Sequence, residues 1–106
     1  MRQLDVHQLK TRLGEPAEKP LLLDVREPWE LRLCAIEGTL HIPMGQIPAR
    51  LGELDPARET VVICHHGVRS YQVAYFLERK GFQNIYNLSG GIDAWAREID
   101  PAMAKY

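Results

Sequence analysis

The sequence predicts an α/β fold in which a central parallel sheet of four or five strands is covered by helices on both faces. Short apolar, β-branched runs alternate with segments of helical period, which is typical of strands joined by crossover helices. Residues 21–25 (LLLDV) and 60–64 (TVVIC) are nearly continuous apolar runs, as strands buried on both faces require. Because the chain has 106 residues and shows no linker or repeat, we expect one domain over residues 1–106.

Three weaker segments extend the predicted sheet. Residues 39–42 (TLHI) and 84–88 (NIYNL) are short apolar runs, and residues 2–6 (RQLDV) could add an edge strand. The count of four or five strands depends on these segments.

The strongest predicted helix covers residues 70–81 (SYQVAYFLERKG), where apolar side chains recur at helical spacing. Ser70 offers an N-cap and Gly81 a C-terminal stop. Shorter helical candidates cover residues 6–14, 27–34, 45–54 and 90–99. Pro28 suits the first turn of its helix, whereas Pro48 predicts a short or irregular one. Residues 100–106 are expected to form a frayed tail or a final short turn.

Composition limits the classes of function. Apolar residues make up 45% and charged residues 25% of the chain, and the formal net charge is −1, as in a soluble globular protein. Neither nucleic acid nor an anionic membrane is an expected partner. The sequence starts without an apolar segment of signal-peptide length, which predicts a cytoplasmic protein. In that reducing compartment Cys34 and Cys64 are expected to stay unpaired, so Cys64 is a free thiol.

Cys64 lies at the carboxyl end of the strongest predicted strand, and the best helix starts about six residues later. Ligands of open α/β sheets bind outside such strand ends. Gly67 relieves the steric limit on φ, so residues 64–69 can turn tightly and present successive amides at a helix N-terminus. Those amides, the helix dipole and Arg69 would stabilise a thiolate at neutral pH, which predicts a nucleophilic Cys64.

Two other interpretations of Cys64 are open. It could be a buried residue at a strand end without chemistry, although Gly67 and Arg69 at these offsets argue against that. It could instead bind a metal together with His65 and His66, and with His41 as a fourth ligand. Adjacent residues rarely converge on one ion and no paired ligand spacing is present, so we expect no metal. We expect His65 and His66 to flank the pocket mouth as exposed side chains, where one could donate to a bound anion.

Four blocks in the same order resemble the rhodanese-like sulfurtransferases, and specifically their small single-domain members. They are residues 21–30 (LLLDVREPWE), 38–43 (GTLHIP), 64–70 (CHHGVRS) and 87–95 (NLSGGIDAW). The resemblance implies a rhodanese-like fold and a Cys64 that accepts sulfane sulfur as a persulfide. It also implies that no metal or organic cofactor takes part.

The resemblance implies roles for the remaining residues of the loop. The amides of His65, His66, Gly67, Val68 and Arg69 would cradle the sulfur, and Arg69 would bind the anionic group of the donor. Thiosulfate or a related small donor would lose its outer sulfur to Cys64, and a thiol or cyanide would then accept it. Related phosphatases have five residues between the cysteine and the arginine, whereas this chain has four. The shorter loop favours sulfur over phosphate or arsenate.

Other matching residues are expected to support the site. Asp24 and Arg26 lie in a matching block, and the resemblance implies that this pair supports the structure around the site. The alternative is an ion pair on the protein surface. Ser70 ends the loop block and is expected to support it. Cys34 departs from the common pattern, because many members carry glycine and histidine at positions 34 and 35. It could be a second thiol that resolves the persulfide, but we favour a buried apolar role.

Three functions are compatible with these features. The leading one is a sulfurtransferase of the thiosulfate type. The second is a sulfur-relay carrier that receives or delivers sulfur through a protein partner. The third is a non-catalytic regulatory module, but such modules typically lack the cysteine that is present here at position 64.

Overall fold

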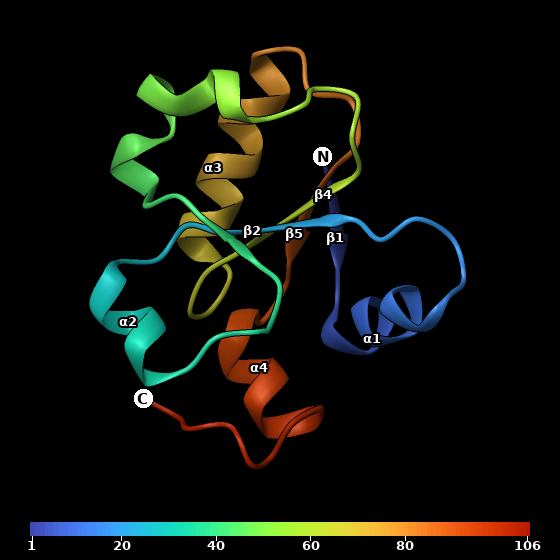
Figure 1. Ribbon diagram of the computed structural model, residues 1–106, viewed down its shortest axis with the longest axis vertical. Helices are drawn as coiled ribbons and strands as arrows, with labels where there is room; N and C mark the ends of the chain where they lie inside the picture. The colour runs from blue at the N-terminus through green and yellow to red at the C-terminus, as the bar shows by residue number, and fades with distance from the viewer.

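The computed structural model describes residues 1–106, which form one parallel sheet with the strand order β1-β5-β4-β2-β3 (Figure 1). The strands are β1 (Arg2–Leu4), β2 (Leu21–Asp24), β3 (Leu40–His41), β4 (Thr60–Ile63) and β5 (Ile85–Leu88). All five predicted strands are confirmed, and β1 is an edge strand as expected. The central strand β4 pairs with β2 on one side and β5 on the other, and all four of its residues are buried because helices cover both faces of the sheet.

The helices also occupy the predicted segments. They are α1 (Val6–Gly14), α2 (Pro28–Leu33), α3 (Val68–Arg79) and α4 (Gly91–Glu98). Pro28 is the first residue of α2, where its missing amide removes no helical hydrogen bond. Around Pro48 the chain forms two 3₁₀ helices, η1 (Met44–Gln46) and η2 (Pro48–Glu53), which confirms the irregular segment. No helix is both long enough and apolar enough to cross a membrane.

The start of α3 differs from the expectation. Ser70 is not the N-cap, because the helix already begins at Val68 and the N-cap is Gly67, whose φ is +102°. The left-handed conformation of Gly67 lets the chain turn directly from the loop into the helix. Ser70 is therefore buried in the first turn of α3, near Cys64. The end of the helix at Arg79 agrees with the stop predicted at Gly81, whose φ is +95°.

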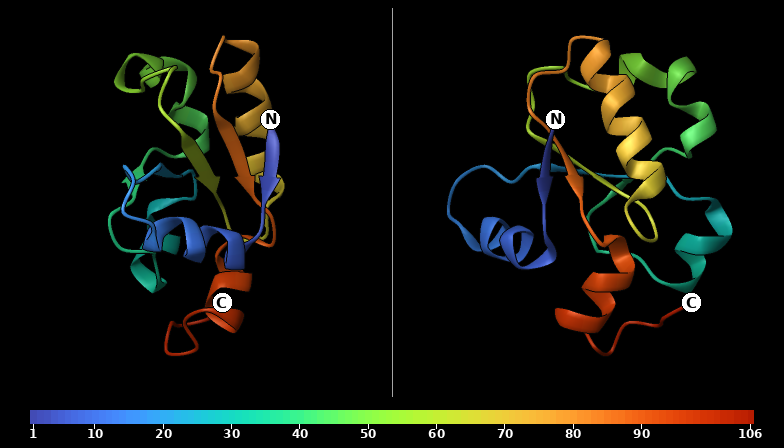
Figure 2. Two further views of the ribbon diagram at one scale, coloured as in Figure 1. Left: turned by 90° about the vertical axis from the view of Figure 1, so that its right-hand side faces the viewer. Right: turned by 180° about the vertical axis from the view of Figure 1, so that it is seen from behind.

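The core lies on both faces of the sheet. Alternation along β4 directs Val62 and Cys64 to one face and Val61 and Ile63 to the other. The first face packs against α3, and the second packs against α1 and α4, which lie beside each other (Figure 2). Helices therefore cover both faces, as predicted, and Cys64 belongs to the face that α3 covers.

The segment after α4 is a correction to the predicted frayed tail. It makes the expected turn at residues 101–102 and then runs back to α2, so that residue 106 lies beside that helix (Figure 1). The Tyr106 ring meets the Trp29 ring edge-on, with 6.0 Å between their centroids. This segment, the loops after β2 and β4, and α2 therefore lie at the carboxyl edge of the sheet, where α/β folds bind ligands.

Candidate active site

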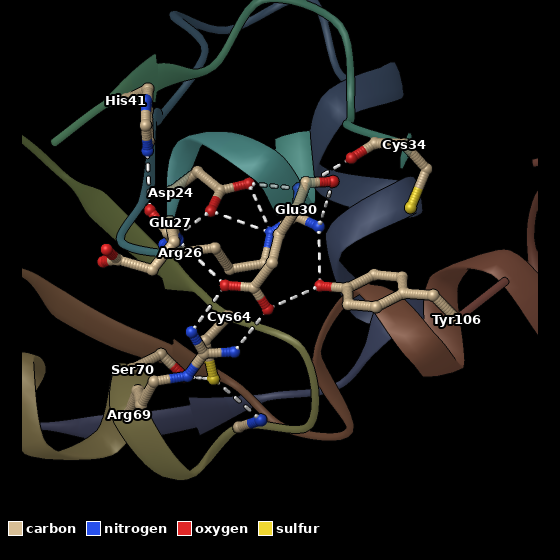
Figure 3. A network of polar contacts seen from close by, with 11 residues as sticks. Asp24, Arg26, Glu27, Glu30, Cys34, His41, Cys64, Arg69, Ser70 and Tyr106 are labelled. Atoms are coloured by element: carbon tan, nitrogen blue, oxygen red, sulfur yellow. Dashed lines mark hydrogen bonds and ion pairs between the residues drawn. The ribbon is translucent and has the colours of Figure 1, made fainter. Parts of the chain in front are cut away.

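Cys64 directly follows β4 and is only 1% exposed. Its Sγ accepts a hydrogen bond from the Gly67 amide at 3.1 Å, and its thiol donates to the Ser70 hydroxyl at 3.3 Å (Figure 3). A loop amide and the first turn of α3 thus both reach the sulfur. The contact from Gly67 agrees with the turn of amides that the spacing of Cys64 and Gly67 predicts, whereas the contact to Ser70 follows from the earlier start of α3.

The N-terminus of α4 holds the loop after Cys64 through the backbone carbonyls of that loop. The Ile92 amide donates to the Cys64 carbonyl at 2.9 Å, and the Asp93 amide donates to the His65 carbonyl at 3.0 Å. These amides have no partner within their own helix, so the loop carbonyls satisfy them. Since the C=O and N–H groups of a trans peptide point in opposite directions, this anchoring turns the next loop amides away from α4.

Gly91 is the residue that lets α4 approach the loop so closely. Its φ is +60°, and a β-carbon there would lie 2.4 Å from the His65 carbonyl oxygen and 2.6 Å from that of Cys64. We expect Gly91→Ala to lower the free energy of unfolding by roughly 2–4 kcal/mol, because it adds both a backbone clash and left-handed strain. Denaturant unfolding measures the stability, and the alkylation rate of Cys64 shows whether the loop has moved.

Gly52→Ala is the matched control, because a β-carbon at Gly52 meets no atom within 4 Å. It should leave both the stability and the alkylation rate nearly unchanged. Equal stability of the two alanine variants would show that α4 does not constrain the loop.

Asn87 on β5 is a buried polar residue that the sequence reasoning missed. Its Oδ1 accepts a hydrogen bond from the Ser70 hydroxyl at 2.5 Å, and its Nδ2 donates to the Gly67 carbonyl at 3.2 Å. The side-chain amide of Asn87 therefore holds both residues that contact the Cys64 sulfur, Ser70 and Gly67. The sequence does contain a signal for this residue, because Asn87 is a polar residue inside an otherwise apolar strand. A buried polar group in such a strand normally has a hydrogen-bond partner.

Arg69 lies in the first turn of α3 and binds Glu30 of α2. The guanidinium donates to the two carboxylate oxygens at 2.7 Å and 2.9 Å, and Figure 3 shows this pair in the same polar network as Cys64. The hydrogen bonds from Arg69 lower the pKa of Glu30 to about 2. In turn Glu30 raises the pKa of Arg69. Glu30 was also missed from sequence, although it lies in a matching block, and it holds the arginine that we predicted to bind the donor.

Asp24 and Arg26 form a fully buried ion pair, so the alternative of a surface pair is wrong. The Asp24 carboxylate accepts from Arg26 Nε and Nη2 at 2.8–3.1 Å, and Nη2 also donates to the Cys34 carbonyl at 2.8 Å. Burial opposes the charge of Arg26, but the bonds to Asp24 and Tyr106 outweigh it and raise the pKa of Arg26. The pair connects the loop after β2 to the end of α2.

The two histidines of the loop differ from each other. The side chain of His66 is 62% exposed, as predicted, but His65 is half-buried, which corrects its prediction. The His65 ring lies between the rings of His66 and Tyr106, with 3.9 Å between centroids on each side. Burial, with a smaller effect of the neighbouring His66, lowers the pKa of His65. It is therefore a mainly neutral, packed side chain at neutral pH.

A metal site is poorly supported by the geometry. Donor atoms of His65, His66 and Asp93 lie within 4.8 Å of one another, whereas Cys64 and His41 are not part of this group. His41 instead contacts the Arg26 carbonyl at 2.6 Å. The two histidine rings stack with only 30° between their planes, so their nitrogen lone pairs do not converge as tetrahedral coordination requires. Asp93 is, moreover, already paired with Arg97 at 2.5 Å.

Cys34 is partly buried and packs with the core cluster on the face of the sheet opposite to Cys64. This packing agrees with the apolar role that we favoured. The Val68 side chain is 67% exposed, so only its backbone belongs to the site.

Comparison with known proteins places these features in a family. Residues 5–98 match the model of the rhodanese-like domain. A sulfurtransferase of Allochromatium vinosum is 38% identical over 98% of this chain and 96% of its own length. A Bacillus subtilis protein whose name describes a sulfur carrier is 38% identical over 74% of this chain, and the match spans only 43% of that protein. The crystal structure of a rhodanese-like domain protein from Staphylococcus aureus superposes with a TM-score of 0.86 and 29% identity, covering 100% of this chain and 99% of that one.

Proposed function

The chain belongs to the rhodanese-like domain family, and on that premise we propose that it is a thiosulfate-type sulfurtransferase that works through a persulfide on Cys64. The observation that carries this proposal is the contact of the Gly67 amide with the Cys64 sulfur. The Gly67 amide donates to the sulfur at 3.1 Å and can stabilise negative charge on that atom, whereas the Ser70 hydroxyl accepts the thiol proton and donates its own proton to Asn87. Sulfur transfer needs such stabilisation twice, once for the thiolate and once for the persulfide anion.

The reaction proceeds by two displacements at sulfur. The Cys64 thiol first loses its proton to solvent, and the thiolate attacks the outer sulfur of thiosulfate. The S–S bond of thiosulfate breaks, sulfite leaves with the electron pair, and the outer sulfur stays on Cys64 as a persulfide anion. A thiolate or cyanide then attacks this outer sulfur, and the Cys64 thiolate leaves with its electron pair.

Arg69 is the group that would bind the anionic part of the donor. Its guanidinium is near enough to Cys64 for their charges to interact, and Glu30 occupies two of its five N–H donors (Figure 3). The remaining donors suit the oxygens of thiosulfate, since arginine binds oxyanions through charge-assisted hydrogen bonds. The amides of residues 65–69 would surround the transferred sulfur.

Sulfur loading tests the proposal directly. After incubation with thiosulfate, we expect the intact protein to gain the mass of one sulfur atom, and cyanide should remove it as thiocyanate. Cys34→Ser should load to the same extent, because Cys34 packs on the other face of the sheet. Phosphate and arsenate substrates serve as controls and should remain unchanged. Turnover of a phosphate ester without sulfur loading would refute the proposal.

A sulfur-relay carrier is the second candidate, favoured by the relative whose name describes a sulfur carrier. In that case the donor or acceptor is a protein, and loading from thiosulfate is incidental. The same mass measurement separates the two functions. A protein persulfide that loads Cys64 where thiosulfate does not would favour the carrier.

A further inference from the structure

Tyr106 connects the segment after α4 to the candidate active site. Its hydroxyl accepts a hydrogen bond from Arg26 Nη1 at 2.9 Å and donates one to Glu30 Oε1 at 2.9 Å (Figure 3). Its ring stacks on the His65 ring, with 3.9 Å between centroids and 6° between planes. One side chain therefore contacts α2, the loop after β2 and the loop after β4.

We propose that Tyr106 is a positioning residue for sulfur transfer. Its hydroxyl keeps Glu30 in place to hold Arg69 near Cys64, and its ring keeps His65 in the loop. This inference rests on the function proposed above. It assigns a role to a segment that the sequence predicted to be a frayed tail or a short turn.

The hydroxyl acts by separating two ion pairs. One ion pair joins Arg26 to Asp24, and the other joins Glu30 to Arg69. The Tyr106 hydroxyl lies between the two pairs, where it accepts a hydrogen bond from Arg26 and donates one to Glu30. Burial, together with the bond to Glu30, raises the pKa of Tyr106 to about 12, so the hydroxyl keeps its proton at neutral pH. Without it, Arg26 Nη1 would keep only its 3.5 Å contact to the Glu30 carbonyl and would attract the Glu30 carboxylate away from Arg69.

The ring acts by packing. The His65 Nε2 atom is buried and makes no hydrogen bond, so that end of the imidazole is not held by a polar contact. The Tyr106 ring instead covers one face of the imidazole and His66 covers the other. Because His65 directly follows Cys64, movement of its ring would disturb the loop that surrounds the sulfur.

Two variants separate these contributions. Tyr106→Phe removes only the hydroxyl, and Tyr106→Leu also removes the stacked ring. Tyr75→Phe is the matched control, because the Tyr75 hydroxyl contacts only the exposed Arg79 on the outer face of α3. Circular dichroism verifies that each variant is folded at the assay temperature.

The first readout is the ratio of the Cys64 alkylation rates with iodoacetate and iodoacetamide, measured on the Cys64 peptide by mass spectrometry. The two reagents differ mainly in charge, so the ratio reports the positive field of Arg69 at the sulfur. We expect this ratio to fall roughly threefold in Tyr106→Phe. The change should be toward the ratio measured for Arg69→Leu, the reference variant that lacks the positive charge. This readout needs no sulfur donor, so it tests Tyr106 even if the proposed function fails.

The second readout is the rate of a single round of sulfur loading as a function of thiosulfate concentration. In Tyr106→Phe the half-saturating concentration should rise roughly threefold while the maximal rate stays within about twofold, since a loosened Arg69 weakens donor binding. In Tyr106→Leu the maximal rate should also fall by roughly tenfold. If both variants match Tyr75→Phe in the alkylation ratio and in half-saturation, Tyr106 has no positioning role. A wild-type protein that never loads would contradict the proposed function alone.

Discussion

Cys64→Ser is expected to abolish sulfur loading and to lower turnover of thiosulfate with cyanide by at least about 10³-fold. A serine hydroxyl remains protonated at neutral pH and cannot form the persulfide. It has nearly the size of the thiol and can keep the contacts to the Gly67 amide and the Ser70 hydroxyl, so the buried site should stay folded. Intact-mass analysis measures loading, and thiocyanate production measures turnover.

Cys34→Ser is the control for this prediction, because it removes the other thiol of the chain from the opposite face of the sheet. It should retain most of the activity and the full mass gain. If Cys64→Ser keeps its activity while Cys34→Ser loses it, the nucleophile has been assigned to the wrong cysteine.

Arg26→Met should have the largest effect on stability, lowering the free energy of unfolding by about 3–5 kcal/mol. Arg26 and Asp24 are both 0% exposed, so removal of the guanidinium leaves a carboxylate buried without its partner. The bonds from Arg26 to the Cys34 carbonyl and the Tyr106 hydroxyl are lost at the same time. Urea unfolding followed by circular dichroism gives the change in free energy.

A double-mutant cycle tests whether this loss comes from the pair. Asp24→Asn combined with Arg26→Met should cost clearly less than the sum of the single variants, because the double variant buries no net charge. Arg50→Met is the surface control, since Arg50 and Glu53 form an exposed pair that should contribute little. Additive single effects would mean that Asp24 and Arg26 act independently.

Much of the fold could be predicted because its signals are local. The apolar runs around β2 and β4 are long enough to identify buried strands, and the helical spacing of α3 is unambiguous. The loop from Cys64 to Arg69 could be predicted as a site because strand end, glycine and helix start follow one another within a few residues. The start of α3 was misplaced because the left-handed Gly67 ends the loop earlier than a serine cap would.

The residues that complete the site could not be predicted in this way. Glu30 reaches Arg69 across 39 positions, Asn87 reaches Ser70 across 17, and Tyr106 reaches Arg26 across 80. Each contact depends on which strands are neighbours in the sheet and on where the segment after α4 packs. No periodicity or spacing within one element carries that information.

The sequence by itself therefore determined the family, the parallel sheet and the position of Cys64 between a strand end and a helix start, since these depend on short patterns of apolar residues and turn-forming residues. The tertiary structure alone decided that the Asp24–Arg26 pair is buried, that Arg69 is held by Glu30, and that α4 anchors the loop carbonyls. The physical reason is that buried charges and free helix amides must find partners wherever the fold places them. Those partners lie far away along the chain.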